Sequence, residues 1–307
     1  MRKDRKDVDR VRKMVAAAMA AVMTLSLCFG QAVPAKADTA QVKPYISFGA
    51  DLTTSQKNKV MELLGVSQDE LADYEVLEIT NQDEHDYLDS YLDSSVIGSK
   101  ALSSVKIEEA DAGSGISVET HNISFCTSEM YSNALATAGV SDATVTVAGP
   151  FQLSGTAALV GAMKAYGAMT GDTVDQESAD AATNELVVTG ELGESIGKEE
   201  AAQLVALVKN KVLSGDLSSD AQIEKAIEDA AKELGITITD EEKASLLSLM
   251  KKIAGLDLDW GKVKNQAKGI YDKLQGMNID TEQAKSFLAK VASFFSSLLD
   301  KLAQMFQ

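Results

Sequence analysis

The sequence predicts an α+β fold, in which an N-terminal layered α/β domain of about five short strands with helices precedes an all-helical C-terminal domain. Between Tyr45 and Met169, short strand patterns alternate with helices that begin at capping residues. From about Gln176 onward the strand signals fade, and apolar residues recur at helical spacing. The predicted order is a signal peptide, an α/β domain and a helical domain, at residues 1–37, 38–172 and 173–307.

The leader has the pattern of an export signal. An uncharged apolar run from Met14 to Gly30 follows a basic cluster made of Arg2, Lys3, Arg5, Lys6, Arg10, Arg12 and Lys13. The small residues of Ala35-Lys36-Ala37 suit a signal peptidase, so cleavage is expected between Ala37 and Asp38. The mature protein is therefore expected to be secreted or extracytoplasmic, in association with the cell envelope.

Two other fates of the leader are alternatives. Lipid attachment at Cys28 is disfavoured because Leu27 stands where a small residue is needed. Retention as a membrane anchor is disfavoured by the many alanines and two polar breaks. No comparable apolar run follows, so we expect no integral membrane span in the mature chain.

The mature chain is strongly acidic. The leader holds 8 of the 29 basic and 3 of the 46 acidic residues, so the remainder has a formal net charge of −22. This charge repels phosphate backbones and argues against a nucleic-acid partner. Cys126 is the only cysteine after the leader, so no internal disulfide is expected. No cofactor signature is present, and none is expected to bind.

The first strands and helices of the α/β part follow from local signals. We expect a strand over Tyr45–Gly49 and a second over Tyr74–Ile79. Thr53 to Gln56 matches a capping box for a helix that ends at Gly65. A further helix is expected to start in Asn81-Gln82-Asp83-Glu84 and to extend through Leu92.

The next segment suggests a hairpin. The stretches 101–108 and 116–121 have strand patterns, and the turn-forming residues 111–115 separate them. Thr127 is expected to cap a helix that stops at Gly139, and Ala143–Ala148 alternates as a strand before Pro150. Ser154 then opens a helix whose small residues allow close packing against a neighbour, namely Ala157, Ala158, Gly161, Ala162 and Ala165.

The remainder is expected to be helical. Apolar positions at helical spacing predict helices over 199–213, 221–234 and, after a capping box at Thr239 and Glu242, through Ile253. A final helix from about Thr281 carries half of the chain's eight phenylalanines on one apolar stripe. Burial within its own domain, self-association and contact with a membrane are the alternatives for that stripe.

Three groups of residues are candidates for chemistry. Ser154, Gly155 and Thr156 lie at a predicted strand-to-helix junction, where free amides and hydroxyls suit an anion or ligand site, with Asn133 as a polar helper. A simple helix cap and a serine nucleophile are the alternatives, although Gln152 replaces the first glycine of a nucleophile elbow.

Cys126, His121 and His85 are the only residues from which a thiol dyad or a zinc site could be built, and a buried apolar role is expected for the cysteine. Asp257 and Asp259 resemble the start of a calcium loop, but Lys262 and Lys268 break that pattern. We therefore predict no catalytic residue and no metal site.

Several strings, in order, carry a resemblance to a known family. They are Phe48-Gly49-Ala50-Asp51-Leu52, Leu64-Gly65-Val66, Ile79-Thr80-Asn81 with Glu84 and Tyr87-Leu88, Ile97-Gly98-Ser99-Lys100-Ala101-Leu102-Ser103-Ser104, Met130-Tyr131-Ser132-Asn133-Ala134-Leu135, Thr137-Ala138-Gly139-Val140, Pro150-Phe151 and Ser154-Gly155-Thr156-Ala157-Ala158-Leu159. Over 45–213 the chain resembles the YpuA-like family of exported bacterial proteins of unknown function. The resemblance implies a shared fold and an extracytoplasmic setting, and no activity.

The hypothesis that follows is a secreted or envelope-associated, non-enzymatic binding protein whose partner is an unknown envelope protein or wall component. The alternative is a hydrolase or ligand-binding protein with its site at the Ser154 helix N-terminus. A third hypothesis is an assembly subunit that self-associates through the terminal helix.

Overall fold

The structure is a computed structural model that describes residues 43–171, 174–215 and 217–256. The predicted leader with its cleavage site at Ala37 and Asp38, the loop at Asp257 and Asp259, and the helix from Thr281 lie outside the described residues. Their interpretation stays a prediction.

Strands and helices alternate first, and helices alone follow. The strands are β1 (Tyr45–Gly49), β2 (Glu75–Ile79), β3 (Ser104–Glu109), β4 (Ile116–Ile123) and β5 (Ala143–Leu153). The helices among and directly after them are α2 (Thr54–Leu63), the 3-10 helix η1 (Glu70–Asp73), α3 (Asn81–Leu88), α4 (Ser94–Ile97), α5 (Ser128–Thr137) and α6 (Thr156–Thr170). The later helices are α7 (Gln176–Ile196), α8 (Lys198–Ser214), α9 (Asp220–Leu234) and α10 (Asp240–Ala254). The predicted α+β fold class is confirmed.

The five strands form one mixed sheet in the order β2-β1-β3-β5-β4. β1 and β2 are parallel, as are β4 and β5, and β3 pairs antiparallel with β1 and β5. The predicted hairpin of β3 and β4 is therefore wrong, because β5 lies between them. Val145 and Val147 of β5 are fully buried, and a strand buried in this way takes an interior position with a neighbour on each side, here β3 and β4.

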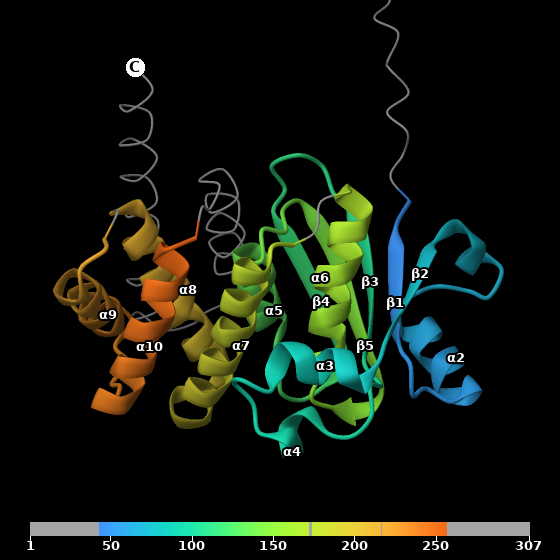
Figure 1. Cartoon of the computed structure of the whole chain (residues 1–307), viewed down its shortest axis with the longest axis horizontal. Helices are drawn as coiled ribbons and strands as arrows, with labels where there is room; N and C mark the ends of the chain where they lie inside the picture. Colours follow the sequence, from blue (N-terminus) through green and yellow to red (C-terminus); the bar gives the residue numbers. More distant parts are fainter. Residues whose placement is uncertain (1–42, 172–173, 216, 257–307) are drawn as a thin grey trace, which may run out of the picture. The chain divides into compact units, whose positions relative to one another are not determined.

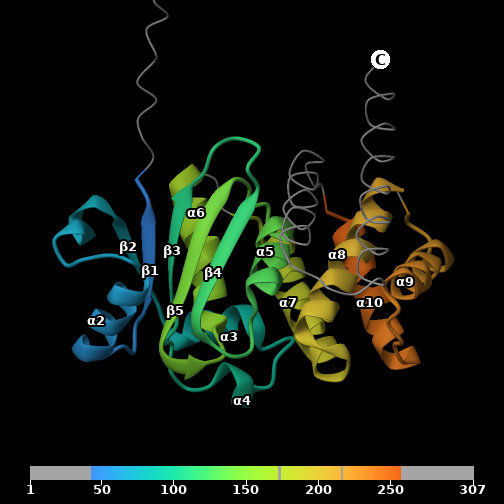
Figure 2. The same ribbon diagram turned by 180° about the vertical axis from the view of Figure 1, so that it is seen from behind.

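The helix α6 lies directly on one face of the sheet (Figure 1). A Cβ atom on its Gly161 would lie 2.7 Å from the Ser47 hydroxyl of β1, so only glycine permits this approach. The opposite side of β1 packs on α2, where Ile46 and Phe48 meet Val60. Strands β3, β5 and β4 face the viewer when the molecule is turned around (Figure 2).

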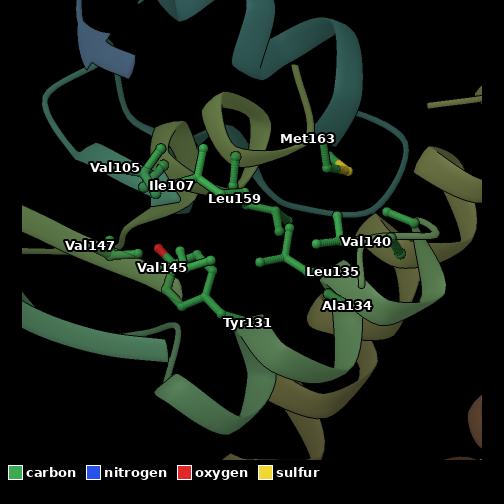
Figure 3. Close-up of a cluster of buried hydrophobic side chains, with 14 of the residues drawn as sticks. Val105, Ile107, Tyr131, Ala134, Leu135, Val140, Val145, Val147, Leu159 and Met163 are labelled. Carbon is green, nitrogen blue, oxygen red and sulfur yellow. The ribbon is translucent and has the colours of Figure 1, made fainter. Parts of the chain in front are cut away.

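The main core lies between the sheet and the helices α5 and α6 (Figure 3). Val105 of β3 and Val145 of β5 contribute from the sheet, and Tyr131, Leu135 and Leu159 contribute from the helices. All five side chains are fully buried. Removing such contacts by truncation to alanine costs about 2–5 kcal/mol each, so this layer anchors α5 and α6 rigidly on the strands.

Most of the predicted helix signals are confirmed. Capping boxes form at Thr53 with Gln56 and at Thr239 with Glu242, and Thr127 caps α5. Two boundaries differ from prediction. The cap of α3 is Thr80 rather than Asn81, because the Thr80 side chain and the third helical residue bond each other's backbones, and the helix ends at Leu88 instead of Leu92.

The strand β5 also differs from prediction, because it continues past Pro150 to Leu153. A register shift between His121 and Ile123 of β4 lets Ile123 pair with Leu153. Asn122, at the shift, has a φ of 59°. The irregular strand end tolerates the missing N–H of proline, which a regular central strand would not.

The helices α8, α9 and α10 share a second core with part of α7. The apolar positions predicted to face inward are buried except Leu234 of α9, which is partly buried. The buried ones are Leu204, Val205, Val208, Val212, Ile223, Ile227, Ala230, Leu246, Leu249, Met250 and Ile253. Within the described ranges, none of the helices is long and apolar enough to span a bilayer.

A buried ion pair joins α5, α7 and α8. The Lys209 ammonium lies 2.7 Å from Glu185 and donates to the Asn133 carbonyl and the Thr137 hydroxyl, each at 3.0 Å. Thr137 in turn donates to Glu185. Burial lowers the pKa of Lys209, and the Glu185 charge opposes that effect. All three ammonium protons therefore have partners, which a buried amine requires.

Candidate functional site

Four strands end at the same edge of the sheet. The pairing directions place the carboxyl ends of β1, β2, β4 and β5 beside the start of β3. In open α/β sheets, ligands bind outside the carboxyl ends of the strands. This edge, with the loop 98–103 and the start of α6, is therefore the place to look for a site.

The loop 98–103 is clamped to the end of β1. The Asp51 carboxylate accepts from the Ala101 N–H at 2.8 Å, and the Asp51 N–H donates to the Ala101 carbonyl at 3.1 Å. A Cβ atom on Gly49 would lie 2.3 Å from that carbonyl oxygen, so a side chain there would push the loop away. The loop thus has a fixed position beside the sheet.

Gly155, not Ser154, is the N-cap residue of the helix α6, which begins at Thr156. Its φ is 98°, and glycine has no side chain of its own that could cap the helix. The prediction that Ser154 caps this helix is therefore wrong, because the left-handed backbone at 155 turns the chain before the helix starts. The Tyr131 hydroxyl donates to the Gly155 carbonyl at 2.5 Å, and the Ala158 N–H donates to the Ser103 hydroxyl at 2.9 Å.

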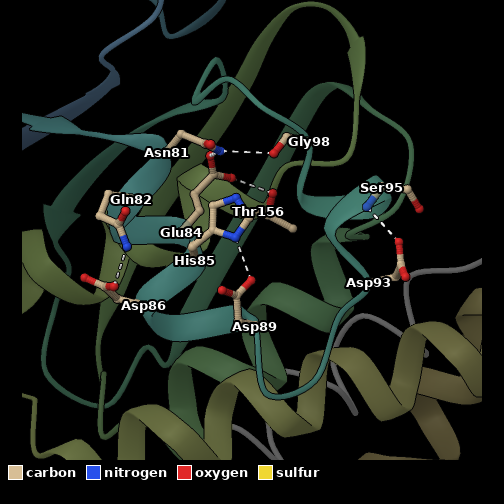
Figure 4. A network of polar contacts seen from close by, with 10 residues as sticks. All are labelled: Asn81, Gln82, Glu84, His85, Asp86, Asp89, Asp93, Ser95, Gly98 and Thr156. Atoms are coloured by element: carbon tan, nitrogen blue, oxygen red, sulfur yellow. Dashed lines mark hydrogen bonds and ion pairs between the residues drawn. The ribbon is translucent and has the colours of Figure 1, made fainter.

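A buried carboxyl group lies beside this helix start (Figure 4). Glu84 of α3 is 1% exposed and accepts a hydrogen bond from the Thr156 hydroxyl at 2.7 Å. Its other oxygen accepts from the Asn81 amide, which also donates to the Gly98 carbonyl, both at 3.3 Å. Burial raises the pKa of Glu84, and the bonds from Thr156 and Asn81 offset part of that effect.

The hydrogen-bond chain continues outward from Glu84. The Thr156 and Ser154 hydroxyl oxygens are 3.2 Å apart. Because Thr156 gives its only hydroxyl proton to Glu84, Ser154 is the donor in this pair. The Ser154 oxygen is left with its lone pairs as acceptors for any group that approaches.

These residues line a pocket with a volume of about 480 Å³, within the usual range for small-molecule sites. Its walls come from α3, α4, the loop 98–103, the ends of β4 and β5, and the start of α6. Hydroxyl side chains dominate its polar lining, namely Ser95, Ser99, Ser103, Ser124, Ser154 and Thr156. The pocket suits recognition by hydrogen bonds.

One histidine stands next to the pocket. His85 follows Glu84 on α3, and its Nδ1 lies 2.6 Å from the Asp89 carboxylate. The Asp89 hydrogen bond raises the pKa of His85, burial opposes it, and the Gly98 backbone adds a smaller upward contribution. The pair lies along α3 itself, and neither residue lines the pocket.

The structure brings together only part of the predicted site. Ser154 and Thr156 line the pocket, and Gly155 forms its corner. Asn133 lies elsewhere, because its amide donates to the Ala202 carbonyl of α8 at 3.0 Å. Cys126 is 1% exposed, as predicted for an apolar role, and burial raises the pKa of its thiol to about 12.

His121 pairs with Glu119 at 3.3 Å rather than with the thiol. Among the described residues, no cluster of three or more His, Cys, Asp or Glu side chains suits a metal ion. Sequence reasoning missed Glu84 as a site residue. The signal that could have found it is its place shortly after the Ile79-Thr80-Asn81 string, which lies at a strand end.

Fold and site together define an α+β protein with a hydroxyl-lined pocket at one edge of a mixed sheet. The chain belongs to the DUF1002 family, described as a protein of unknown function, whose pattern matches residues 48–270. It is similar to the uncharacterized protein YpuA of Bacillus subtilis (strain 168), with 42% identity over 272 residues that cover 88% of this chain and 92% of the relative. No solved structure matches it. Membership confirms the resemblance to the YpuA-like family of unknown function, and export stays a prediction.

Proposed function

We propose that this protein is exported and acts as a non-enzymatic binding protein of the bacterial cell envelope, with its ligand seated in the pocket at the start of α6. The main support for this proposal is that four segments far apart in the sequence meet at that pocket. Phe48–Leu52, Ile79–Asn81, Ile97–Ser104 and Ser154–Leu159 all meet there, and each contributes a contact that shapes it.

Export is supported by the basic and apolar leader and by the acidic mature chain. Its test is the N-terminal residue of the protein recovered from the envelope or the medium. We expect the mature chain to begin at Asp38. Recovery of the intact leader on cytosolic protein would refute this part of the proposal.

Binding is tested by blocking the pocket. Ser99 lines it and is exposed, so S99W fills it without disturbing the core. The mature protein and S99W are sedimented with isolated cell-wall and membrane fractions. Ser117 of β4 is equally exposed outside the pocket, and S117W is the matched control. Loss of co-sedimentation in S99W alone is expected, and equal behaviour of both variants contradicts the proposal.

The chain Ser154–Thr156–Glu84 also favours a second function, hydrolysis with Ser154 as nucleophile. In that reaction the Ser154 proton passes to Thr156 as Thr156 releases its own to Glu84. S154A separates the two functions. A hydrolase loses turnover in S154A and still binds, whereas the binding protein shows no turnover of captured envelope material in either form.

A further inference from the structure

We infer that the pocket takes an uncharged, hydroxyl-rich ligand, namely the sugar rings of a glycan. This inference rests on the proposed binding function and names its ligand class. Its starting point is the set of hydrogen-bonding groups that remain available at the pocket wall.

The innermost wall accepts hydrogen bonds. Thr156 donates to Glu84, and Ser154 therefore donates to Thr156, so the Ser154 oxygen offers lone pairs to the pocket. A carboxylate or phosphate dianion has no proton to give to that oxygen. A ligand hydroxyl has one, and it can also accept from the other serines of the wall.

The charges around the pocket oppose each other. The Glu84 carboxyl group lies beneath the hydroxyl wall and repels an anion. The N-terminus of α6 carries the positive end of the helix dipole, and Lys100 adds a positive charge on the loop, so these groups oppose the negative charge of Glu84. The pocket therefore favours neither sign of ligand charge, and an uncharged ligand does not depend on either.

The pocket also has an apolar side. Phe125, Val96 and Leu153 contribute to its lining. The Phe125 ring is fixed from two directions, because Gly190 of α7 leaves room for its tip and the Lys198 ammonium lies 5.6 Å from its centroid. Sugar rings combine a hydroxyl-bearing edge with C–H faces that pack on aromatic and aliphatic groups. The wall therefore matches both sides of a sugar.

The test is a titration of the mature protein, followed by NMR or calorimetry. The probes are two neutral glycans, an N-acetylglucosamine tetrasaccharide and maltotetraose, and two anions, inorganic phosphate and a triglutamate peptide. Saturable binding of at least one glycan is expected, with weaker binding of both anions. S154A should lower the glycan affinity about 5- to 10-fold, the effect of one lost hydrogen bond. S117A is the matched control and should change nothing.

Failure of this inference is distinguishable from failure of the binding function. If neither glycan binds, or if an anion binds more tightly, the ligand class is wrong. Equal glycan affinity in S154A and the unaltered protein would place the sugar outside this pocket. In each case, a loss of envelope binding in S99W would still support the proposed function.

Discussion

Removal of the Thr156 hydroxyl should destabilise the protein through Glu84. In T156V a methyl group replaces the hydroxyl, and Glu84 keeps only its bond from Asn81. Thr156 and Glu84 are each 1% exposed, so water does not replace the lost donor. A hydrogen bond to a charged group contributes about 1.5–3 kcal/mol. We expect T156V to lose about 2 kcal/mol in the free energy of unfolding, which lowers Tm by about 4–8 °C in a protein of this size.

The loss should depend on pH. Burial holds the folded pKa of Glu84 above its unfolded value of 4.5. Such a group contributes stability below the unfolded pKa, and this contribution is lost as pH rises through the folded pKa. T156V removes a donor to the ionised form and raises that pKa further. The difference in stability between T156V and the unaltered protein is therefore larger above the folded pKa of Glu84 and shrinks in acid.

The assay is urea unfolding at about pH 7.5 and about pH 4.5. T156S is the control, because it keeps the hydroxyl and loses one methyl group, about 0.8 kcal/mol at either pH. If T156V and T156S lose equal stability at both pH values, the bond to Glu84 does not stabilise the fold and the reasoning is refuted.

Three further variants test other contacts. S154A should change stability by less than about 0.5 kcal/mol in thermal unfolding, because Ser154 does not cap α6. A loss of stability near 1 kcal/mol would instead support the interpretation of Ser154 as a helix cap. K209M should lower the free energy of unfolding by about 3–5 kcal/mol in urea unfolding, because it leaves Glu185 buried without its charge partner. The double variant K209M/E185L should recover most of this lost stability. No recovery would contradict the ion-pair argument. In G190A the new Cβ would lie 2.4 Å from the Phe125 ring, so we expect a net loss of about 1–2 kcal/mol in the free energy of unfolding. The second substitution F125L should relieve this loss. A stabilised G190A would show that the ring moves freely.

Local structure was predictable where its cause lies within a few residues. The capping boxes at Thr53 and Thr239 form because both partners are three residues apart, and the stop of α5 at Gly139 needs only that residue's positive φ of 87°. Apolar spacing likewise predicted the inward faces of α8, α9 and α10. In these cases tertiary contacts agree with the local preference.

Strand order was not predictable in the same way. The turn-forming residues 111–115 suggested that β3 and β4 pair, yet they only connect strands that lie two places apart. Which strand lies between β3 and β4 is decided by burial over the whole sheet. Residues of β5 pair with both β3 and β4. No local sequence pattern indicates that β5, rather than β4, pairs with β3.

Only part of the site was predictable, because only part of it depends on residues that are close in the sequence. Ser154 and Thr156 were candidates because a strand-to-helix junction is visible in the sequence. Glu84 was missed because an acidic residue in the first turn of a helix is normally an exposed partner of the helix dipole. Its burial follows only when α6 packs against α3, 72 residues later in the chain.

The protonation state of Glu84 links stability to recognition. When Glu84 is ionised, it draws the proton of Thr156, and Ser154 faces the pocket as an acceptor. When Glu84 is protonated, it can donate to Thr156, and the direction of both hydroxyl bonds reverses. A sugar hydroxyl both donates and accepts, so it fits either direction. A carboxylate fits only the reversed chain, so its binding would strengthen as pH falls through the raised pKa of Glu84, whereas glycan binding should change little.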